Sequence, residues 1–194
     1  ESMKDRRGRG ETRTQRRLPA PPALPVCIGL VALVAAIYGQ TGGFDYVTFD
    51  DDLYASQNPV VRAGLTAPGL KWAFLETHLG FWIPATWLSL MLDVELFGPS
   101  PGAQHLVNAA MHAANAALVF AVLRRTTGAL WPSAFAAALF AVHPLRVESV
   151  AWVTERKDVL STFFWVLTMA AYVRYVETSS PGWYAGTVAA FVLG

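Results

Sequence analysis

A stretch rich in ionisable side chains lies between two apolar runs in the second half of this sequence. From His143 to Asp158 it contains one histidine, three acids and three bases, whereas residues 134–142 and 159–173 are mostly apolar. Charged groups beside such runs are costly at a membrane unless they are paired, hydrated or functional. Cations in this position can hold a phosphate group. Simple capping of two helices at the lipid headgroups is the alternative.

Three consecutive aspartates, Asp50, Asp51 and Asp52, form a second acidic group. Adjacent carboxylates repel each other, so one of them can take up a proton and serve as a general base. Carboxylate oxygens are also the ligands that divalent cations prefer, and a hydrated acidic turn is the alternative to both roles. An acid that activates a hydroxyl, facing cations that receive a phosphate, would suit group transfer from a phosphorylated lipid.

The apolar segment at residues 105–123 carries four polar side chains: His105, Asn108, His112 and Asn115. Their spacings of three, four and three residues place them on one narrow helical face, because each residue turns the helix by about 100°. Such a face points toward a bundle interior or borders a hydrated cavity. Alternatively, these groups make interhelical hydrogen bonds. We expect the second role for the two asparagines, whereas His105 fits either.

The composition is that of an integral membrane protein. Hydrophobic residues make up 54% of the 194 residues and charged residues 15%, with a mean hydropathy of +0.35, whereas soluble domains carry about 25% charged residues. The seven Trp, eleven Phe and six Tyr suit aromatic belts at two membrane faces. The single cysteine, Cys27, excludes an intrachain disulfide and a cysteine-based zinc site. We therefore expect an all-α, polytopic transmembrane helix bundle.

The elements that position the polar groups follow from the alternation of apolar and polar segments. A basic, Pro-rich tail at residues 1–23 is expected to be disordered, and the transmembrane domain occupies residues 24–194. Four full spans are predicted at residues 24–38, 105–123, 129–142 and 159–173. The first is expected to stay uncleaved, because no small-residue cleavage site ends it. A fifth span begins at Trp183 and is truncated, so we expect the chain to be a fragment of a longer protein.

The segments between these spans are expected to form two outer regions. A large first outer loop at residues 45–104 contains two short predicted helices, one capped by Thr66 and one opening at Pro84 and lying in the membrane interface. A second outer segment occupies residues 143–158, where Pro144 favours a helix start. A single helix there would place Glu148 and Glu155 on one face.

Charge divides unequally between the two ends of the predicted spans. The end with the tail and the turns near residues 124–128 and 174–182 carries ten Lys and Arg against four acids, whereas the other end carries five bases against ten acids. By the positive-inside rule the basic end should be cytoplasmic. The N-terminus is then cytoplasmic, and both acidic groups share the outer face.

A series of short motifs occurs between residues 44 and 175: Phe49-Asp50-Asp51-Asp52-Leu53-Tyr54 with Asn58-Pro59, His105-Leu106-Val107-Asn108 with His112, His143-Pro144, Glu148-Ser149-Val150-Ala151-Trp152, and Arg156-Lys157-Asp158. In this order the series resembles the membrane O-mannosyltransferases that carry tetratricopeptide repeats, members of the GT-C superfamily of polytopic glycosyltransferases. The resemblance implies the N-terminal part of a GT-C-like bundle, about four full spans plus a truncated fifth. The later spans and the repeats of that family are missing from this chain.

The activity implied by the resemblance is transfer of a hexose, with mannose expected, from a polyprenyl-phosphate sugar to Ser or Thr hydroxyls of a protein on the outer face. The resemblance implies that Asp50 or Asp51 is the general base and that the donor phosphate is bound by His143, Arg156 and Lys157. It implies four supporting residues, Glu148, Asp158, His105 and Asn108. If a metal binds, its implied ligands are Asp50, Asp51 and Glu148. The third aspartate, Asp52, leaves the choice of base open. The fragment alone is expected to be inactive.

The implied partners are a membrane lipid donor and a protein acceptor, with no nucleic acid. The implied location is the bacterial inner membrane or the endoplasmic reticulum. Whether a divalent cation is required besides the donor is left open by the resemblance. Two other functions stay open: a transporter or channel subunit, and a non-catalytic scaffold whose missing repeats bind partners. A transport path needs polar residues on several helices, and the apolar run at 134–142 weighs against it. A scaffold predicts that the acids tolerate replacement.

Overall fold

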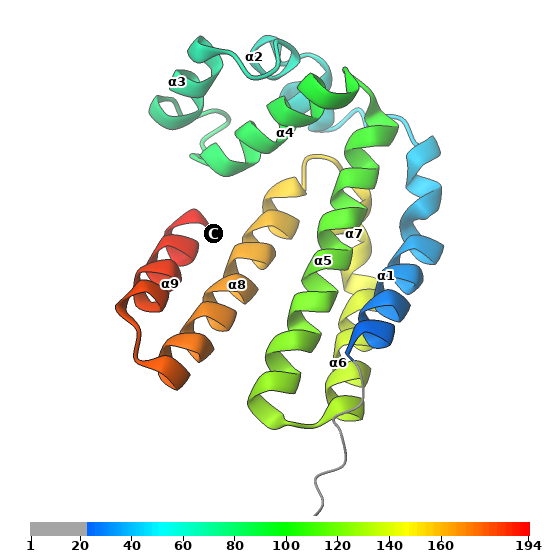
Figure 1. Cartoon of the computed structure of the whole chain (residues 1–194). Coiled ribbons are helices and arrows are strands. Elements are labelled where there is room, and N and C mark those ends of the chain that lie inside the picture. Colours follow the sequence, from blue (N-terminus) through cyan, green and yellow to red (C-terminus); the bar gives the residue numbers. More distant parts are fainter. Residues whose placement is uncertain (1–22) are drawn as a thin grey trace, which may run out of the picture.

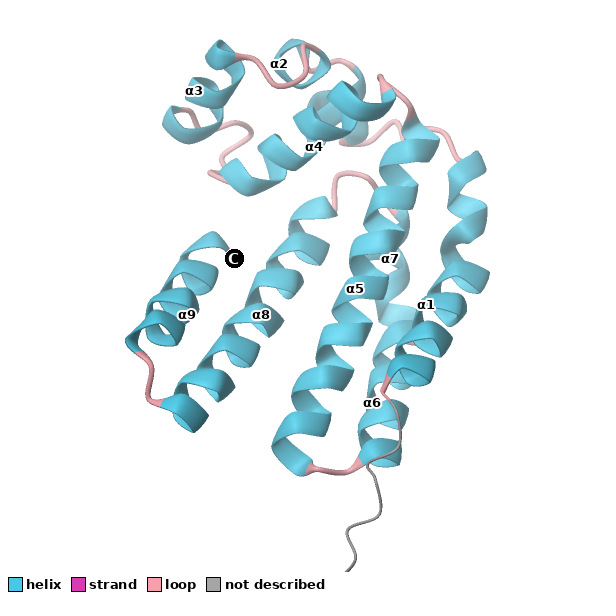
Figure 2. Ribbon diagram, in the orientation of Figure 1, coloured by secondary structure: helices cyan, strands magenta, loops and turns pink. Residues whose placement is uncertain are grey.

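The computed structural model describes residues 23–194 and is built from helices joined by short loops (Figure 1). The predicted tail at residues 1–23 lies, except for its last residue, outside the described part. Within the described part no β-strand forms (Figure 2), and the one strand-like pairing is an isolated bridge between His78 and Phe81. The prediction of an all-α fold is confirmed.

The α-helices of residues 23–194 are, in chain order, α1 (Leu24–Tyr38), α2 (Pro59–Arg62), α3 (Ala67–Leu75), α4 (Pro84–Phe97), α5 (Pro101–Thr127), α6 (Leu130–Val142), α7 (Val147–Ala151), α8 (Arg156–Thr178) and α9 (Pro181–Leu193). Short helical turns occur at Gly39–Gly43, Asp52–Ser56 and Pro144–Arg146. Both helices that were predicted inside the first outer loop form, and Thr66 caps α3 by accepting a hydrogen bond from Gly69 N at 3.1 Å.

Three segments within residues 23–194 are long and apolar enough to cross a membrane: Leu24–Gly43, Pro101–Thr127 and Val153–Thr178. A fourth crossing forms where Leu130–Val142 and Pro144–Ala151, bent by 53°, count as one broken span. The protein is thus an integral membrane helix bundle. α5 extends beyond its predicted span at both ends, because Ser100 caps its start and Gly128 ends it in the left-handed conformation.

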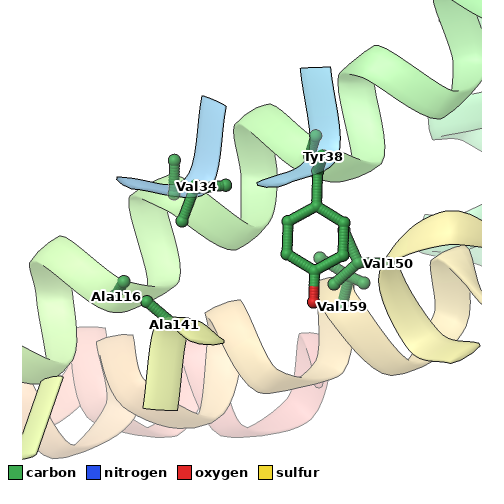
Figure 3. Packing of buried hydrophobic residues seen from close by; sticks show 8 residues of the cluster. Val34, Tyr38, Ala116, Ala141, Val150 and Val159 are labelled. Atoms are coloured by element: carbon green, nitrogen blue, oxygen red, sulfur yellow. The ribbon is translucent and has the colours of Figure 1, made fainter. Parts of the chain in front are cut away.

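The long helix α5 is the centre of the bundle. α1, α6 and α8 pack against it, and α9 packs against α8 (Figure 1). Figure 3 shows Tyr38 of α1 pointing toward Val150 and Val159, while Ala116 of α5 and Ala141 of α6 lie side by side. Both alanines are fully buried. Such small residues let neighbouring membrane helices approach closely, and they fix the frame that holds the polar segments at the helix ends.

The segment between α1 and α5 gathers at the end of the bundle where α5 and α8 begin (Figure 1). α4, which was expected to lie in the membrane interface, packs against α2, α3 and the start of α5. Its residues Trp87, Leu90 and Met91 are fully buried in this small core, together with Val153 from the turn before α8. The α2–α4 segment is therefore joined to the bundle through the second polar segment, residues 143–158.

The single helix predicted from Pro144 is broken, which corrects the expectation that Glu148 and Glu155 share a face. His143 is extended, as residues before proline usually are, and α7 ends at Ala151. Trp152 is extended, and its carbonyl accepts a hydrogen bond from Asn108 Nδ2 at 3.0 Å. A bond from another helix thus takes the place of a bond within the helix. The chain restarts as α8 at Arg156.

Candidate functional site

Asp51 joins the two polar segments of the sequence. Its Oδ2 accepts a hydrogen bond from Val47 N at 2.9 Å, and its Oδ1 accepts from Thr154 N at 2.9 Å and from Thr154 Oγ1 at 2.6 Å. The residue is fully buried. Because both carboxylate oxygens are engaged by donors, Asp51 acts as an anchor between the chain after α1 and the turn before α8.

Asp50 stands in a different environment from its neighbour. Tyr54 N donates to Asp50 O at 2.9 Å, which closes one helical turn between the two residues. The Asp50 carboxylate is half-buried, and within residues 23–194 it makes no hydrogen bond. Asp52, in contrast, accepts a bond from Leu53 N at 2.9 Å. Asp50 is therefore the one of the three aspartates whose oxygens are unused by the described chain.

The side chains around Tyr54 bring acids, a cation and aromatic rings together. Burial raises the pKa of the Tyr54 hydroxyl, and the charges of Asp50 and Glu155 raise it further, because anionic neighbours disfavour a phenolate. Lys157 Nζ lies 5.6 Å from the Tyr54 ring centroid and 6.0 Å from that of Phe81. It also donates to Glu155 Oε1 at 2.7 Å. We call these five residues, Asp50, Tyr54, Phe81, Glu155 and Lys157, the Tyr54 cluster.

An aromatic wall stands behind the Tyr54 cluster. The rings of Tyr54 and Trp87 lie 4.9 Å apart, and Trp72 and His78 both contact Trp87 at centroid distances of 5.2 and 5.5 Å. Trp87 and Tyr54 are almost completely buried. This packing supports the Tyr54 ring, over which Lys157 lies, from α3 and α4.

Arg156, which was predicted as a ligand of the donor phosphate, is held by protein groups in this structure. Its guanidinium is fully buried, with Nη1 donating to Ser89 Oγ at 2.7 Å and Nη2 to Asp93 Oδ2 at 2.7 Å. Nη2 also donates to Gln104 O at 2.9 Å, and Nε donates to Asn108 Oδ1. These partners satisfy the guanidinium inside the protein, and through them Arg156 joins α4, α5 and α8.

The carboxylate opposite Arg156 belongs to Asp93 of α4. Burial raises the pKa of Asp93, and the charge and hydrogen bond of Arg156 oppose that rise. The two charged groups lie 2.7 Å apart. Their mutual attraction opposes the free-energy cost of removing both charges from water. The sequence alone did not indicate this partner of Arg156, because Asp93 lies 63 residues earlier in the chain.

The polar face of α5 makes hydrogen bonds between helices. Asn115 Nδ2 donates to Val159 O at 2.9 Å, and the Nε2 atoms of His105 and His112 lie 3.3 Å from Asp45 O and 3.1 Å from Ala141 O. With the bond from Asn108 to Trp152 O, all four side chains contact a carbonyl outside α5. The interhelical role expected for the asparagines is confirmed. His105, for which either role was open, is buried in the same packing as Asn108.

The other predicted site residues lie outside the Tyr54 cluster. His143 is exposed, and its Nδ1 accepts a bond from Leu145 N at 3.3 Å. Glu148 is exposed on α7, and Asp158 accepts a bond from Ser149 Oγ at 2.8 Å, which joins α7 to α8. No group of three or more His, Cys, Asp or Glu within residues 23–194 is arranged to hold a metal ion. The predicted metal set of Asp50, Asp51 and Glu148 is thus not assembled.

Three members of the Tyr54 cluster, Tyr54, Phe81 and Glu155, were missed as site residues by sequence reasoning, and nothing in the sequence marks Phe81 among the other aromatic residues. Tyr54 was quoted as part of a motif, and its position four residues after Asp50 is the helical spacing that brings two side chains together. Glu155 was assigned to the face of Glu148 on a helix that does not form. Its spacing of two residues from Lys157 gives no signal for their ion pair, because the turn before α8 is irregular.

Comparison with known proteins identifies relatives of the whole arrangement. Residues 81–194 match the family described as dolichyl-phosphate-mannose-protein mannosyltransferase. Protein O-mannosyl-transferase Tmtc2 of Drosophila melanogaster is 34% identical over 169 residues, covering 80% of this chain and 17% of the relative. Protein O-mannosyl-transferase TMTC1 of Mus musculus is 31% identical over 195 residues, covering 91% of this chain and 20% of the relative.

Protein O-mannosyl-transferase TMTC2 of Homo sapiens is 31% identical over 124 residues, covering 60% of this chain and 15% of the relative. The chain therefore spans about a sixth of the length of these curated relatives. No solved structure matches the chain. The family match covers more than half of the sequence and includes α4 to α9 with the second polar segment. The chain belongs to the dolichyl-phosphate-mannose-protein mannosyltransferase family.

Proposed function

We propose that the protein containing this chain transfers a hexose, mannose in the first instance, from a polyprenyl-phosphate donor to Ser or Thr hydroxyls of a protein. The family membership and the names of the relatives support a protein O-mannosyltransferase. The observation that carries the residue assignment is the difference between Asp50 and Asp51. Asp51 is fully engaged by Val47 and Thr154, whereas Asp50 is left with unused oxygens beside Tyr54 and Glu155.

In the proposed reaction Asp50 is the general base. The acceptor hydroxyl oxygen forms a bond to the anomeric carbon of the sugar, and its proton passes to the Asp50 carboxylate. The bond between the anomeric carbon and the phosphate oxygen breaks, and its electron pair leaves with the lipid phosphate. Lys157 stabilises the negative charge on that phosphate, and Glu155, now its partner at 2.7 Å, holds the ammonium in place between turnovers.

His143 stays a candidate for a second contact to the donor phosphate. Its ring is exposed, and the residue lies at the break between α6 and the turn that leads into α7. Arg156 is reassigned to the support of α4 and α5. Asp51, through its bonds to Thr154, is a positioning residue that fixes the turn carrying Asp50 against the turn carrying Glu155.

The side of the membrane is part of the proposal. Arg125 and Arg174 lie at the end of the bundle away from the α2–α4 segment, where both contact Glu177. The excess of basic residues at this end favours a cytoplasmic location. The Tyr54 cluster then faces the outer side, in the lumen of the endoplasmic reticulum or the bacterial periplasm.

The activity is tested with the full-length protein in detergent, labelled polyprenyl-phosphate mannose and a Ser/Thr-rich acceptor protein. Labelled mannose should appear on the acceptor. Lys157→Gln should raise the donor concentration needed for half-maximal rate by roughly ten- to a hundredfold, as expected for the loss of one charged contact to phosphate. Arg62→Gln, a cation on α2 that contacts Ser56 O, is the matched control. A wild-type donor response in Lys157→Gln would remove Lys157 from the donor site.

The transporter alternative finds no support in the described helices. It needs polar side chains along a path through the membrane, and the polar face of α5 is engaged by carbonyls of neighbouring helices. The scaffold alternative predicts that replacing Asp50 leaves function intact, and the same transfer assay decides that point.

A further inference from the structure

A long apolar groove lies between α5, α6 and α8, at membrane depth and apart from the Tyr54 cluster. Its volume is about 780 Å³, and it is lined largely by apolar side chains, among them Val119, Leu123, Phe140, Trp165, Met169 and Tyr172. A separate pocket of about 340 Å³ lies between α8 and α9. The α8 wall of the groove runs from Thr162 to Val173, a length of about 16 Å at the helical rise per residue.

Three of the four threonines that line this groove do little to make it polar. Thr126 Oγ1 donates to Val122 O at 2.9 Å, Thr168 Oγ1 to Phe164 O at 2.8 Å and Thr187 Oγ1 to Trp183 O at 2.9 Å. Each hydroxyl proton is thus used within its own helix. The groove consequently presents hydrocarbon to an occupant along most of its length.

One end of the groove carries a cation. Arg146, which follows α6, lines the groove and lies 5.0 Å above the Phe140 ring centroid. Within residues 23–194 its guanidinium has no carboxylate partner. At the opposite end, next to Thr126, Arg125 is paired with Glu177. The groove is therefore largely apolar, and among its lining residues Arg146 is the one charged side chain.

We propose that this groove binds an anionic bilayer phospholipid, with the lipid phosphate on Arg146 and one acyl chain along α5 and α8. A guanidinium forms charge-assisted hydrogen bonds with phosphate oxygens, and an apolar chain fills a hydrocarbon-lined groove without unsatisfied polar groups. None of the five residues of the Tyr54 cluster lines the groove. The bound lipid is thus a structural ligand distinct from the reacting donor, and the inference stands independently of the proposed function.

The test uses the full-length protein in detergent, titrated with phosphatidylglycerol or with phosphatidylcholine of the same acyl chains while the melting temperature is recorded. A ligand that binds the folded state raises the melting temperature in a concentration-dependent way. Phosphatidylglycerol should stabilise the protein at lower concentration than phosphatidylcholine. Arg146→Gln should weaken the phosphatidylglycerol response by roughly ten- to a hundredfold, whereas Arg146→Lys should retain most of it.

Two further variants keep the test decisive if Arg146→Gln folds poorly. Met169→Trp fills the groove and keeps the cation, so it should abolish the phosphatidylglycerol response. Arg62→Gln removes an exposed cation far from the groove lining and should respond as the wild type does. Equal responses to both phospholipids, or an unchanged response in Arg146→Gln and Met169→Trp, overturn the proposal. So does stabilisation by polyprenyl phosphate alone, which would make the groove a donor site, or by neither lipid, as when another part of the protein covers it.

Discussion

Replacing Arg156 with alanine is expected to loosen the join between α4, α5 and α8. The guanidinium contacts Ser89 and Asp93 on α4, and it also bonds to Gln104 O and Asn108 on α5. No part of the residue is exposed. The substitution removes all of these bonds at once and leaves the Asp93 carboxylate buried without its counter-charge. Stability should therefore suffer before any effect on a donor is seen.

The magnitude follows from the cost of an uncompensated buried charge. Removing one partner of a buried ion pair destabilises a protein by about 3–5 kcal/mol, a large share of a total stability of roughly 5–15 kcal/mol. The double variant Arg156→Met with Asp93→Leu replaces both charges by apolar groups. It should cost much less than Arg156→Ala alone, because no charge is left buried and unpaired.

The pH dependence has a defined sign. In Arg156→Met the burial of Asp93 still raises its pKa, but the opposing effect of the guanidinium is gone. Above the ordinary carboxyl value of 3.8 the folded variant then binds more protons than the unfolded chain, so its stability falls as pH rises. The wild type, in which Arg156 opposes the rise in the pKa of Asp93, should show a weaker dependence over the same range.

The measurement is the midpoint of thermal or denaturant unfolding of the full-length protein in detergent. It is made for the wild type, Arg156→Ala, the single variants Arg156→Met and Asp93→Leu, and the double variant. A coupling free energy of several kcal/mol between the two sites is expected. The reasoning is refuted if Arg156→Ala unfolds like the wild type while its donor response weakens. That result would return Arg156 to the phosphate site predicted from its position before an apolar span.

Three further predictions concern the frame of the site. Thr154→Val should destabilise the protein by roughly 1.5–3 kcal/mol, because it removes a hydroxyl hydrogen bond to a carboxylate, and Thr154→Ser should retain most of the stability in the same unfolding assay. Asn115→Leu should cost about 0.5–2 kcal/mol, the range for a hydrogen bond between membrane helices, and a neutral result would show that its bond to a carbonyl of α8 is dispensable. With Cys27→Ser as background, a cysteine at Ser149 should react with an impermeant thiol reagent added from the outer side. Labelling of a cysteine at Thr127 from that side would reverse the assigned topology.

Local chemistry in the sequence predicted most of the helices. The span at residues 24–38 has the predicted bounds and α4 begins at the predicted Pro84, because proline openings and polar flanks mark helix ends. The interhelical role of the asparagines on α5 followed from their helical spacing, because a polar face on a membrane helix must find hydrogen-bond partners inside the protein. The break at Trp152 could not be predicted, because it depends on hydrogen bonds between distant residues. Asn108 donates to Trp152 O, 44 positions later in the chain, and Thr154 N donates to Asp51, 103 positions earlier.

In the candidate site, too, the sequence indicated which residues matter but not their long-range contacts. Sequence reasoning selected the aspartate cluster and Lys157, but it could not separate Asp50 from Asp51, since adjacent residues of one type look alike without their partners. It assigned Arg156 a role in binding the donor phosphate, because the protein partner of Arg156, Asp93, was unknown. Residue type and spacing thus identified the groups with chemical capacity, and only the tertiary contacts divided them into anchors and groups with free atoms.

The central claim, that Asp50 removes the acceptor proton, is tested most directly by single-turnover transfer of mannose with three variants of the full-length protein: Asp50→Asn, Asp51→Asn and Asp52→Asn. Asp50→Asn should lose at least about 10²-fold in rate, the lower range for a general base, with an unchanged melting temperature. Asp51→Asn should lower the melting temperature, because its oxygens accept three hydrogen bonds, and Asp52→Asn should change both quantities little. A folded Asp50→Asn protein that transfers mannose at the wild-type rate would contradict the account.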